Sequence, residues 1–211
     1  MAKEVFDFAG TDDIAGLKEL WYRCFDIDGA YGDFYFQNRF VPEDTLICRK
    51  NEQIAAMLTL AEVAISGERG YYLYALATLP EFRNQGIMRA MIRRSEEEIR
   101  RRNGTFSCLR PVSSDLFSMY EKLDYETDFF RFFGTLKREE AEKAIFSFRL
   151  CEFEDFYRRR LDYLKKQKNP VTHSRKEHLF IYRDLEKSGG GVVLYEEDGK
   201  EQYIAYTCGK D

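Results

Sequence analysis

One segment of the chain combines an apolar strand pattern, a proline, an arginine and a single glycine at the start of an amphipathic pattern. It runs from Tyr74 to Met91 and reads YALATLPEFRNQGIMRAM. The backbone N–H groups in the first turn of a helix have no partner within the helix, and the helix dipole adds partial positive charge, so anions bind readily there. Gly86 lets the backbone approach a phosphate closely. The pattern therefore predicts a loop that binds a pyrophosphate group.

Two other phosphate-binding loops do not fit these residues. A P-loop needs Gly-Lys followed by Ser or Thr, and a dinucleotide-binding fingerprint needs three glycines in register; the segment has neither. Arg83–Met88 instead resembles the Arg/Gln-x-x-Gly-x-Gly/Ala signature of the GCN5-related N-acetyltransferases (GNATs), and Leu76–Thr78 before Pro80 resembles that family's strand, bulge and loop entry. Met88 stands where the family has a small residue, which makes this amide less open to a phosphate. An ordinary strand-to-helix turn in an unrelated α/β protein is the alternative interpretation of the six-residue motif.

The resemblance implies acetyl-CoA as the cosubstrate and also implies which residues hold it. In this family the strand before the loop hydrogen-bonds the pantetheine arm as if the arm were another strand, and one amide polarises the acyl carbonyl. The loop and the first turn of the next helix hold the pyrophosphate. The residues implied in this sequence are Leu76, Ala77, Thr78, Arg83, Asn84, Gln85, Gly86, Ile87, Met88 and Arg89.

A second resemblance concerns the leaving thiolate, which needs a proton donor. Phe117–Tyr125, reading FSMYEKLDY, resembles the family's (Leu/Phe)-Tyr-Glu-Lys-Leu-Gly-Phe segment and places Tyr120 at the position of the family's acid. Asp124 replaces Gly, Tyr125 replaces Phe, and Ser113 stands where an Asn usually begins the helix. A free tyrosine has a pKa of about 10 and a free thiol a pKa of about 8.5, so full proton transfer from the tyrosine to the thiolate is uphill by about 2 kcal/mol. The hydroxyl is therefore expected to act first as a hydrogen-bond donor. One more core aromatic is the competing interpretation.

The sequence does not identify a general base. Deprotonating a substrate ammonium with a pKa of about 10.4 costs roughly 4 to 5 kcal/mol at about pH 7, and a base or desolvation must supply this. The central strand offers Tyr72 and Tyr74, which leaves Glu62 as a weak candidate and a solvated carboxylate as its alternative interpretation. His173 and His178 have no Cys or Asp at ligand spacing, so we expect neither a metal site nor a triad and place both histidines at the surface.

The strand and helix patterns of residues 1 to 136 follow the order of the acetyltransferase family. Apolar runs predict strands over 5–8, 45–49, 54–65, 71–78, 106–109 and 127–136. Three-and-four spacing predicts helices over 11–25, 88–99 and 113–123. The expected fold is α/β (α+β), with a mixed, mostly antiparallel sheet flanked by helices, and residues 1–140 are expected to form the acetyl-CoA-binding domain.

The C-terminal third repeats part of this order. Helices predicted over 150–166 and 177–187 lead into strands over 192–196 and 202–207, around a turn at Asp198-Gly199. We therefore expect residues 141–211 to form a partial second GNAT-like unit, a plan that resembles the enhanced-intracellular-survival (Eis-like) type. Since no second CoA loop follows, only the first unit is expected to bind the cosubstrate. An exposed edge at the last strand favours pairing with another chain, and hence a homodimer.

Composition excludes several classes of protein. The chain has 211 residues and a formal net charge of −4, and its arginine clusters alternate with or follow acidic residues, so a nucleic-acid partner is not expected. It has neither an apolar run of membrane-spanning length nor a signal-peptide pattern at its start, so no membrane association is expected. The same two observations lead us to expect a cytoplasmic protein. Its five cysteines lack paired metal-ligand spacing and are interpreted as reduced thiols.

These observations lead to one hypothesis and two alternatives. The leading hypothesis is an acetyl-CoA-dependent N-acetyltransferase in which a primary amine attacks the thioester directly; the acceptor is a small amine, an aminoglycoside-like molecule or a peptide amine. Its groove is expected to involve Tyr31–Phe40 and the segment after Tyr125, with core packing as the competing explanation. The first alternative is a non-catalytic acyl-CoA-binding sensor or assembly subunit. The second is a related acyl or aminoacyl transferase on the same fold.

Overall fold

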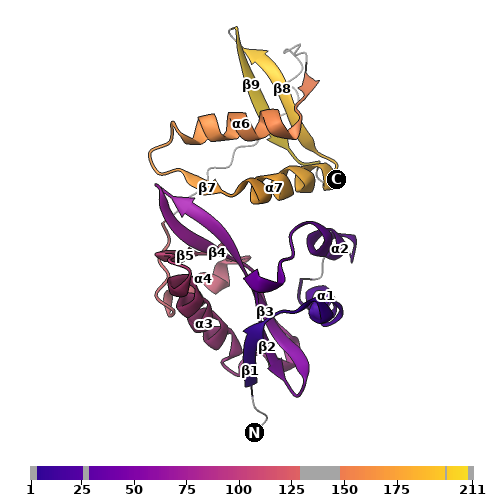
Figure 1. The fold of residues 1–211 in the computed structure, drawn as a ribbon, viewed down its shortest axis with the longest axis vertical. Helices are drawn as coiled ribbons and strands as arrows, with labels where there is room; N and C mark the ends of the chain where they lie inside the picture. The colour runs from indigo at the N-terminus through magenta and orange to yellow at the C-terminus, as the bar shows by residue number, and fades with distance from the viewer. Residues whose placement is uncertain (1–3, 26–28, 129–147, 198, 209–211) are drawn as a thin grey trace. The chain divides into compact units, whose positions relative to one another are not determined.

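The chain folds into two compact units in the computed structural model (Figure 1). The structure describes residues 4–25, 29–128, 148–197 and 199–208. The first unit contains residues 1–114 and 168–174, and the second contains residues 115–167 and 175–211. The expected domain boundary after residue 140 lies outside the described ranges, so that division stays a prediction.

The first unit is built on a six-stranded sheet of order β1-β2-β3-β4-β5, in which β7 also pairs with β3. Only β4 and β5 run parallel; the other neighbouring strands are antiparallel. The expected mixed, mostly antiparallel sheet is therefore confirmed. Its strands are β1 (Glu4–Phe8), β2 (Thr45–Lys50), β3 (Gln53–Ile65), β4 (Glu68–Thr78), β5 (Phe106–Cys108) and β7 (Val171–His173).

Two tight turns join the three long strands of this sheet. Asn51 and Glu52 have φ values of 53° and 64° between β2 and β3, and Ser66 and Gly67 have φ values of 52° and 89° between β3 and β4. Paired left-handed residues match the right-handed twist of neighbouring antiparallel strands, which is why such two-residue turns are favoured in hairpins. These turns lie between the strands that the sequence predicts over 45–49, 54–65 and 71–78.

Helices cover both faces of the sheet (Figure 1). Helices α1 (Ile14–Phe25) and α2 (Gly29–Asn38) lie on one face. A short 3₁₀ turn over Thr11–Asp13 precedes α1. On the other face lies α3 (Ile87–Arg101). The apolar stripe of α1 buries Leu17, Leu20 and Trp21, and that of α3 buries Ile87, Met91, Ile92 and Ile99. The aromatic-rich segment that sequence patterns left without an element forms α2.

The second unit contains α4 (Phe117–Glu121) and a three-stranded antiparallel sheet of order β6-β8-β9. Its elements after α4 are β6 (Arg149–Leu150), α6 (Phe153–Leu164), α7 (Arg175–Lys187), β8 (Gly191–Glu197) and β9 (Lys200–Tyr206). Its core contains Cys151, Phe156, Val192 and Leu194. The helix expected from residue 150 begins at Phe153, because Arg149 and Leu150 pair with β8. The strand expected over 127–136 lies outside the described residues apart from its first two positions, which form no strand.

The surface position expected for both histidines is wrong for His178. This side chain is only 1% exposed, and its ring lies 5.1 Å from that of Tyr157 in an edge-on arrangement. His173 is half-buried in β7. Within the described ranges, no helix is long and apolar enough to cross a membrane.

Candidate cofactor-binding site

A bulge interrupts β4 close to its C-terminal end. Thr59 on β3 lies opposite Tyr74, and Met57 lies opposite Ala77, so β4 contains one more residue than β3 over this stretch. Ala75 has a φ of 53°. This left-handed conformation costs an alanine about 1 kcal/mol, and a bulge of this kind bends the strand and re-aims the groups that follow. The groups re-aimed here belong to the segment that the resemblance assigns to the pantetheine arm.

One edge of β4 is open beyond the same bulge. The parallel pairing with β5 extends from Gly70 to Tyr72, where Tyr72 lies opposite Cys108. Within the part of the chain that the structure describes, no strand pairs with residues 73–78 on that side. An extended ligand that carries amide groups can add to such an edge as a further strand. The position and length of the open edge therefore suit a pantetheine arm.

The loop after β4 has the backbone that an anion site needs. Asn84 and Gly86 are both left-handed, with φ values of 60° and 81°, and Gly86 is the N-cap of α3. The space where a Cβ of Gly86 would lie is open, with no atom within 4 Å among the described residues. The first helical hydrogen bond runs from Ala90 N to Gly86 O at 3.1 Å, so the preceding N–H groups of the helix have no partner in α3. The sequence-predicted loop can therefore direct several N–H groups at one pyrophosphate.

Charge around the loop also favours an anion. The first turn of α3, which is described throughout, contains no acidic residue and carries the exposed Arg89. Arg83 is exposed as well, and its Nε donates to the carbonyl of Thr78 at 3.0 Å. Met88, which stands where the family has a small residue, is half-buried. The Arg83 contact is with the residue that ends β4, so it keeps this guanidinium beside the loop.

Side-chain hydrogen bonds hold the loop against two other elements. Gln85 Nε2 donates to the carbonyl of Glu81 at 3.0 Å, and Gln85 Oε1 accepts from Lys50 Nζ at the end of β2 at 2.7 Å. The guanidinium of Arg23 on α1 donates two hydrogen bonds to the Glu81 carboxylate, at 3.0 and 2.9 Å. A backbone N–H bond of Glu81 itself, and then Arg23, lower the pKa of the Glu81 carboxyl. The loop is thus preorganised by contacts with α1 and β2.

Tyr120, the expected acid, lies in α4 of the second unit. Its half-buried ring lies edge-on to that of Tyr125, with centroids 5.9 Å apart, and its carbonyl accepts the N–H groups of Leu123 at 2.8 Å and Tyr125 at 3.2 Å. Asp124 has a φ of 64°, which explains why the family has glycine at this position. Because α4 and the cofactor loop belong to different units, the role of Tyr120 stays a prediction.

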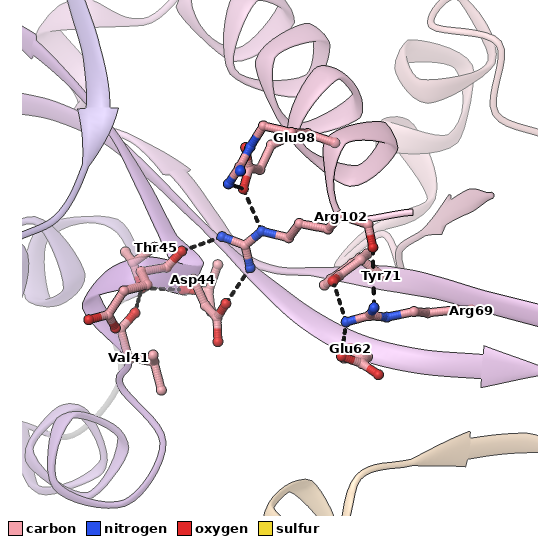
Figure 2. Close-up of polar contacts among 11 residues, drawn as sticks. Val41, Asp44, Thr45, Glu62, Arg69, Tyr71, Glu98 and Arg102 are labelled. Atoms are coloured by element: carbon pink, nitrogen blue, oxygen red, sulfur yellow. Dashed lines mark hydrogen bonds and ion pairs between the residues drawn. The ribbon is translucent and has the colours of Figure 1, made fainter. Parts of the chain in front are cut away.

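Glu62, the weak base candidate, forms an ion pair with Arg69 at 2.6 Å on the strand opposite (Figure 2). It faces Tyr71 across the β3–β4 pair, and the Tyr71 ring lies below the guanidinium of Arg102, which follows α3. Tyr74 lies on the other face, where its ring stacks with that of Tyr35 at 5.6 Å. The structure therefore does not bring Glu62 and Tyr74 together.

The segment expected to line the acceptor groove is partly core. Tyr35 is fully buried, and Phe36 is 9% exposed, so core packing explains both rings. The Tyr35 hydroxyl lies 2.8 Å from Thr59 Oγ1. Tyr31, Phe34 and Phe40 are half-buried and remain groove candidates.

Sequence reasoning missed Arg39, which lies directly beside the bulge. Its guanidinium carbon is 3.7 Å from the centre of the Tyr74 ring, and the residue is only 7% exposed. The one signal in the sequence is a basic residue within an aromatic run. Burial raises the pKa of the nearby Tyr72 hydroxyl, with a smaller contribution from Cys108, while Arg110 and Arg39 oppose that rise.

The fold, the bulged strand and the phosphate loop define the class of protein. Residues 6–127 match the model of the acetyltransferase (GNAT) domain, which covers more than half of the chain. The chain therefore belongs to the GNAT acetyltransferase family, and the cosubstrate of this family is acetyl-CoA, as the sequence predicted. No curated protein matches the chain.

Solved structures share the fold at low sequence identity. A GCN5-related N-acetyltransferase from Anabaena variabilis is 15% identical with a TM-score of 0.66; the match covers 96% of this chain and 54% of that one. An aminoglycoside 6′-N-acetyltransferase from Acinetobacter haemolyticus is 16% identical with a TM-score of 0.51, covering 63% of this chain and 98% of that one. A predicted acetyltransferase from Clostridium acetobutylicum, solved with acetyl-CoA, is 22% identical with a TM-score of 0.50; the match covers 65% of this chain and 98% of that one. At these identities the likeness concerns the fold.

Proposed function

We propose that this chain is an acetyl-CoA-dependent N-acetyltransferase that acetylates a primary amine. One observation carries the proposal: the open edge of β4 continues through the Ala75 bulge into a loop whose Gly86 starts α3 with open space in front of it. A strand edge for an amide-bearing arm and an anion site for a pyrophosphate thus follow each other in the order in which CoA carries these groups.

Each part of the site has a task in the proposed reaction. Residues 76–78 hydrogen-bond the pantetheine arm, and one of their N–H groups polarises the thioester carbonyl. The loop over 83–89 holds the pyrophosphate. The neutral amine attacks the carbonyl carbon, a C–N bond forms, and the C–S bond breaks as the Tyr120 hydroxyl donates to the departing thiolate. The amine's extra proton leaves to solvent or to a base that the sequence does not name.

The C-terminal unit supports a finer assignment. Apart from β7, which lies between α6 and α7 and pairs with the first sheet, the order β6, α6, α7, β8, β9 repeats that of β1, α1, α2, β2, β3. Both sets form antiparallel sheets with the first strand beside the second. We therefore interpret residues 141–211 as a partial second GNAT-like unit of the Eis-like type. The outer edge of β9 is proposed to pair with a second copy, and a monomer by light scattering at high concentration contradicts this.

A non-catalytic acyl-CoA sensor or assembly subunit is the second candidate. The half-buried Met88 in the first turn of α3 favours it, and so does Glu62, because this one candidate base forms an ion pair with Arg69. The five free cysteines suit a reducing compartment, so the cytoplasm is the proposed location of either protein.

Calorimetric titration with acetyl-CoA tests the cofactor site. Gly86→Glu places a carboxylate where the phosphates are expected, so we expect micromolar binding by the native chain and none by this variant. Gly67→Glu is a matched control, since Gly67 also has a positive φ, 89°, and open space at its Cβ position. Absence of binding to the native chain overturns the proposal.

Release of CoA thiol across a panel of amines then separates the two candidates. Turnover with a primary amine supports the enzyme and begins to define its acceptor. Tight binding of acetyl-CoA without transfer or hydrolysis on the whole panel supports the sensor.

A further inference from the structure

Lys50, the last residue of β2, forms a short hydrogen bond with the cofactor loop. Its Nζ donates to Gln85 Oε1 at 2.7 Å and to Glu4 Oε1 at 3.0 Å. The side chain is only 18% exposed. Because the other end of the Gln85 amide donates to the carbonyl of Glu81, both ends of this amide have partners. The Gln85 side chain is therefore held from two sides, by the β2 end and by the start of its own loop.

This anchoring lies at the sharpest turn of the loop backbone, between two left-handed residues. Gln85 is flanked by Asn84 and Gly86, both left-handed. Glycine adopts a left-handed conformation freely and asparagine adopts it more readily than most residues, so the residue types permit this turn and contacts of the Gln85 side chain between them help to fix it. The directions of the N–H groups at the start of α3 depend on this turn, and these N–H groups form the anion site.

We propose that Lys50 is a positioning residue for acetyl-CoA, acting through Gln85 to hold the pyrophosphate loop in its binding conformation. The inference rests on the proposed function. It concerns a residue distant in sequence from the loop, and neither Lys50 nor the Gln85 side chain belongs to the fixed positions of the family signature, which are Arg83, Gly86 and Met88 in this chain.

If Lys50 positions the pyrophosphate loop, its replacement should weaken the binding of ligands that carry a pyrophosphate and leave the binding of other ligands unchanged. Lys50→Met removes a hydrogen bond that holds the loop, and we expect acetyl-CoA to bind about five- to tenfold more weakly, because the net worth of one intramolecular hydrogen bond is a factor of this order. S-acetylpantetheine has the same thioester and arm without the pyrophosphate. Its affinity, measured by competition against acetyl-CoA, is expected to be unchanged within about twofold.

Three further variants locate the effect. Lys50→Arg keeps a cation within reach of Gln85 and is expected to restore most of the affinity. Glu4→Gln removes the ion pair with Lys50 but keeps the Lys50–Gln85 bond, so binding is expected to stay native. In a double-mutant cycle, Lys50→Met combined with Gln85→Met is expected to weaken binding no more than Gln85→Met alone, because Gln85→Met already removes the group that Lys50 binds, together with the bond to Glu81.

The outcomes separate this inference from the proposed function. If the native chain does not bind acetyl-CoA, the proposed function fails. If the native chain binds and Lys50→Met binds equally well, the positioning role alone is overturned. Equal weakening of acetyl-CoA and S-acetylpantetheine overturns it too, since that indicates general damage to the fold. Thermal unfolding of each variant shows whether the fold is retained. If Glu4→Gln binds acetyl-CoA more weakly than the native chain, the Lys50–Glu4 ion pair and not the Lys50–Gln85 bond positions the loop, and the inference is overturned.

Discussion

Arg102 Nε lies 2.5 Å from Glu98 Oε1, one turn back along α3 (Figure 2). The same guanidinium donates to Asp44 Oδ1 at 2.5 Å and to the carbonyl of Glu43, just before β2. The Glu98 and Arg102 side chains are only 10% and 19% exposed. These contacts attach the C-terminal end of α3 to the turn that leads into β2, while the N-terminal end of the same helix forms the phosphate loop.

Removing the Arg102 guanidinium is expected to destabilise the first unit. Arg102→Met leaves Glu98 with a single cationic partner and Asp44 with none in this network, and we expect a loss of about 2 kcal/mol in the free energy of unfolding. Arg101→Met is the control, because Arg101 also pairs with Glu98 but its side chain is 72% exposed, and it is expected to cost less than about 1 kcal/mol. Urea unfolding measures both. Equal losses of unfolding free energy in the two variants contradict the greater contribution assigned to Arg102.

Acid stability is expected to depend on Glu98. The Arg101 guanidinium, followed by that of Arg102, lowers the pKa of the Glu98 carboxyl from 4.5 to about 2. Because the folded pKa lies below the unfolded one, the stabilisation is fully present above pH 4.5 and is lost as the pH falls toward 2. Glu98→Gln should therefore reduce stability at neutral pH and make the acid limb of the unfolding curve shallower. An unchanged limb contradicts this.

The bulge predicts opposite effects for two neighbouring alanines. Ala75→Gly relieves the left-handed strain at φ 53° and is expected to raise the free energy of unfolding by about 0.5 to 1 kcal/mol. Ala77→Gly, at a buried position that pairs with Met57, is expected to lower it by about 1 kcal/mol. Chemical unfolding distinguishes the signs, and a loss in both variants argues against strain at Ala75.

Turnover is expected to depend on the Tyr120 hydroxyl. Tyr120→Phe should lower kcat about 10²-fold and leave acetyl-CoA affinity nearly intact, because the hydroxyl acts only as the thiolate leaves. Tyr125→Phe is the matched control, since the family has phenylalanine at that position. Steady-state kinetics with an active amine measures both. A native rate for Tyr120→Phe removes the assigned role.

Buried thiols are expected to resist alkylation. Burial raises the pKa of Cys108 to about 11, and burial followed by the charge of Glu4 raises that of Cys48 to about 11. Iodoacetamide at about pH 8 should therefore label the exposed Cys208 first, because the thiolate is the reactive form. Since folding holds the thiols of the buried Cys48 and the half-buried Cys108 protonated, the stability that they contribute is lost as pH rises from 9 toward 11. Mass spectrometry of peptides after timed labelling measures the order.

Local chemistry in consecutive residues determined what the sequence could predict. The left-handed turn at Asn51-Glu52, the start of α3 after Gly86 and the length of β3 all follow from residues within a few positions of each other. The short strands β6 and β7 were missed because two or three residues carry no periodicity and depend on pairing with distant strands.

Long-range contacts decided the rest. An alanine gives no sign of a left-handed bulge, and Ala75 adopts one because β3 and β4 pair on both sides of it. Because α2 packs against the sheet, Tyr35 is part of the core and the Arg39 guanidinium lies over the Tyr74 ring. Strand pairing places Lys50 beside Gln85, 35 residues later in the chain. The sequence by itself therefore determined the phosphate loop and the order of elements, whereas only the tertiary structure decided which side chains support that loop, because the energies of such contacts depend on residues far apart in the chain.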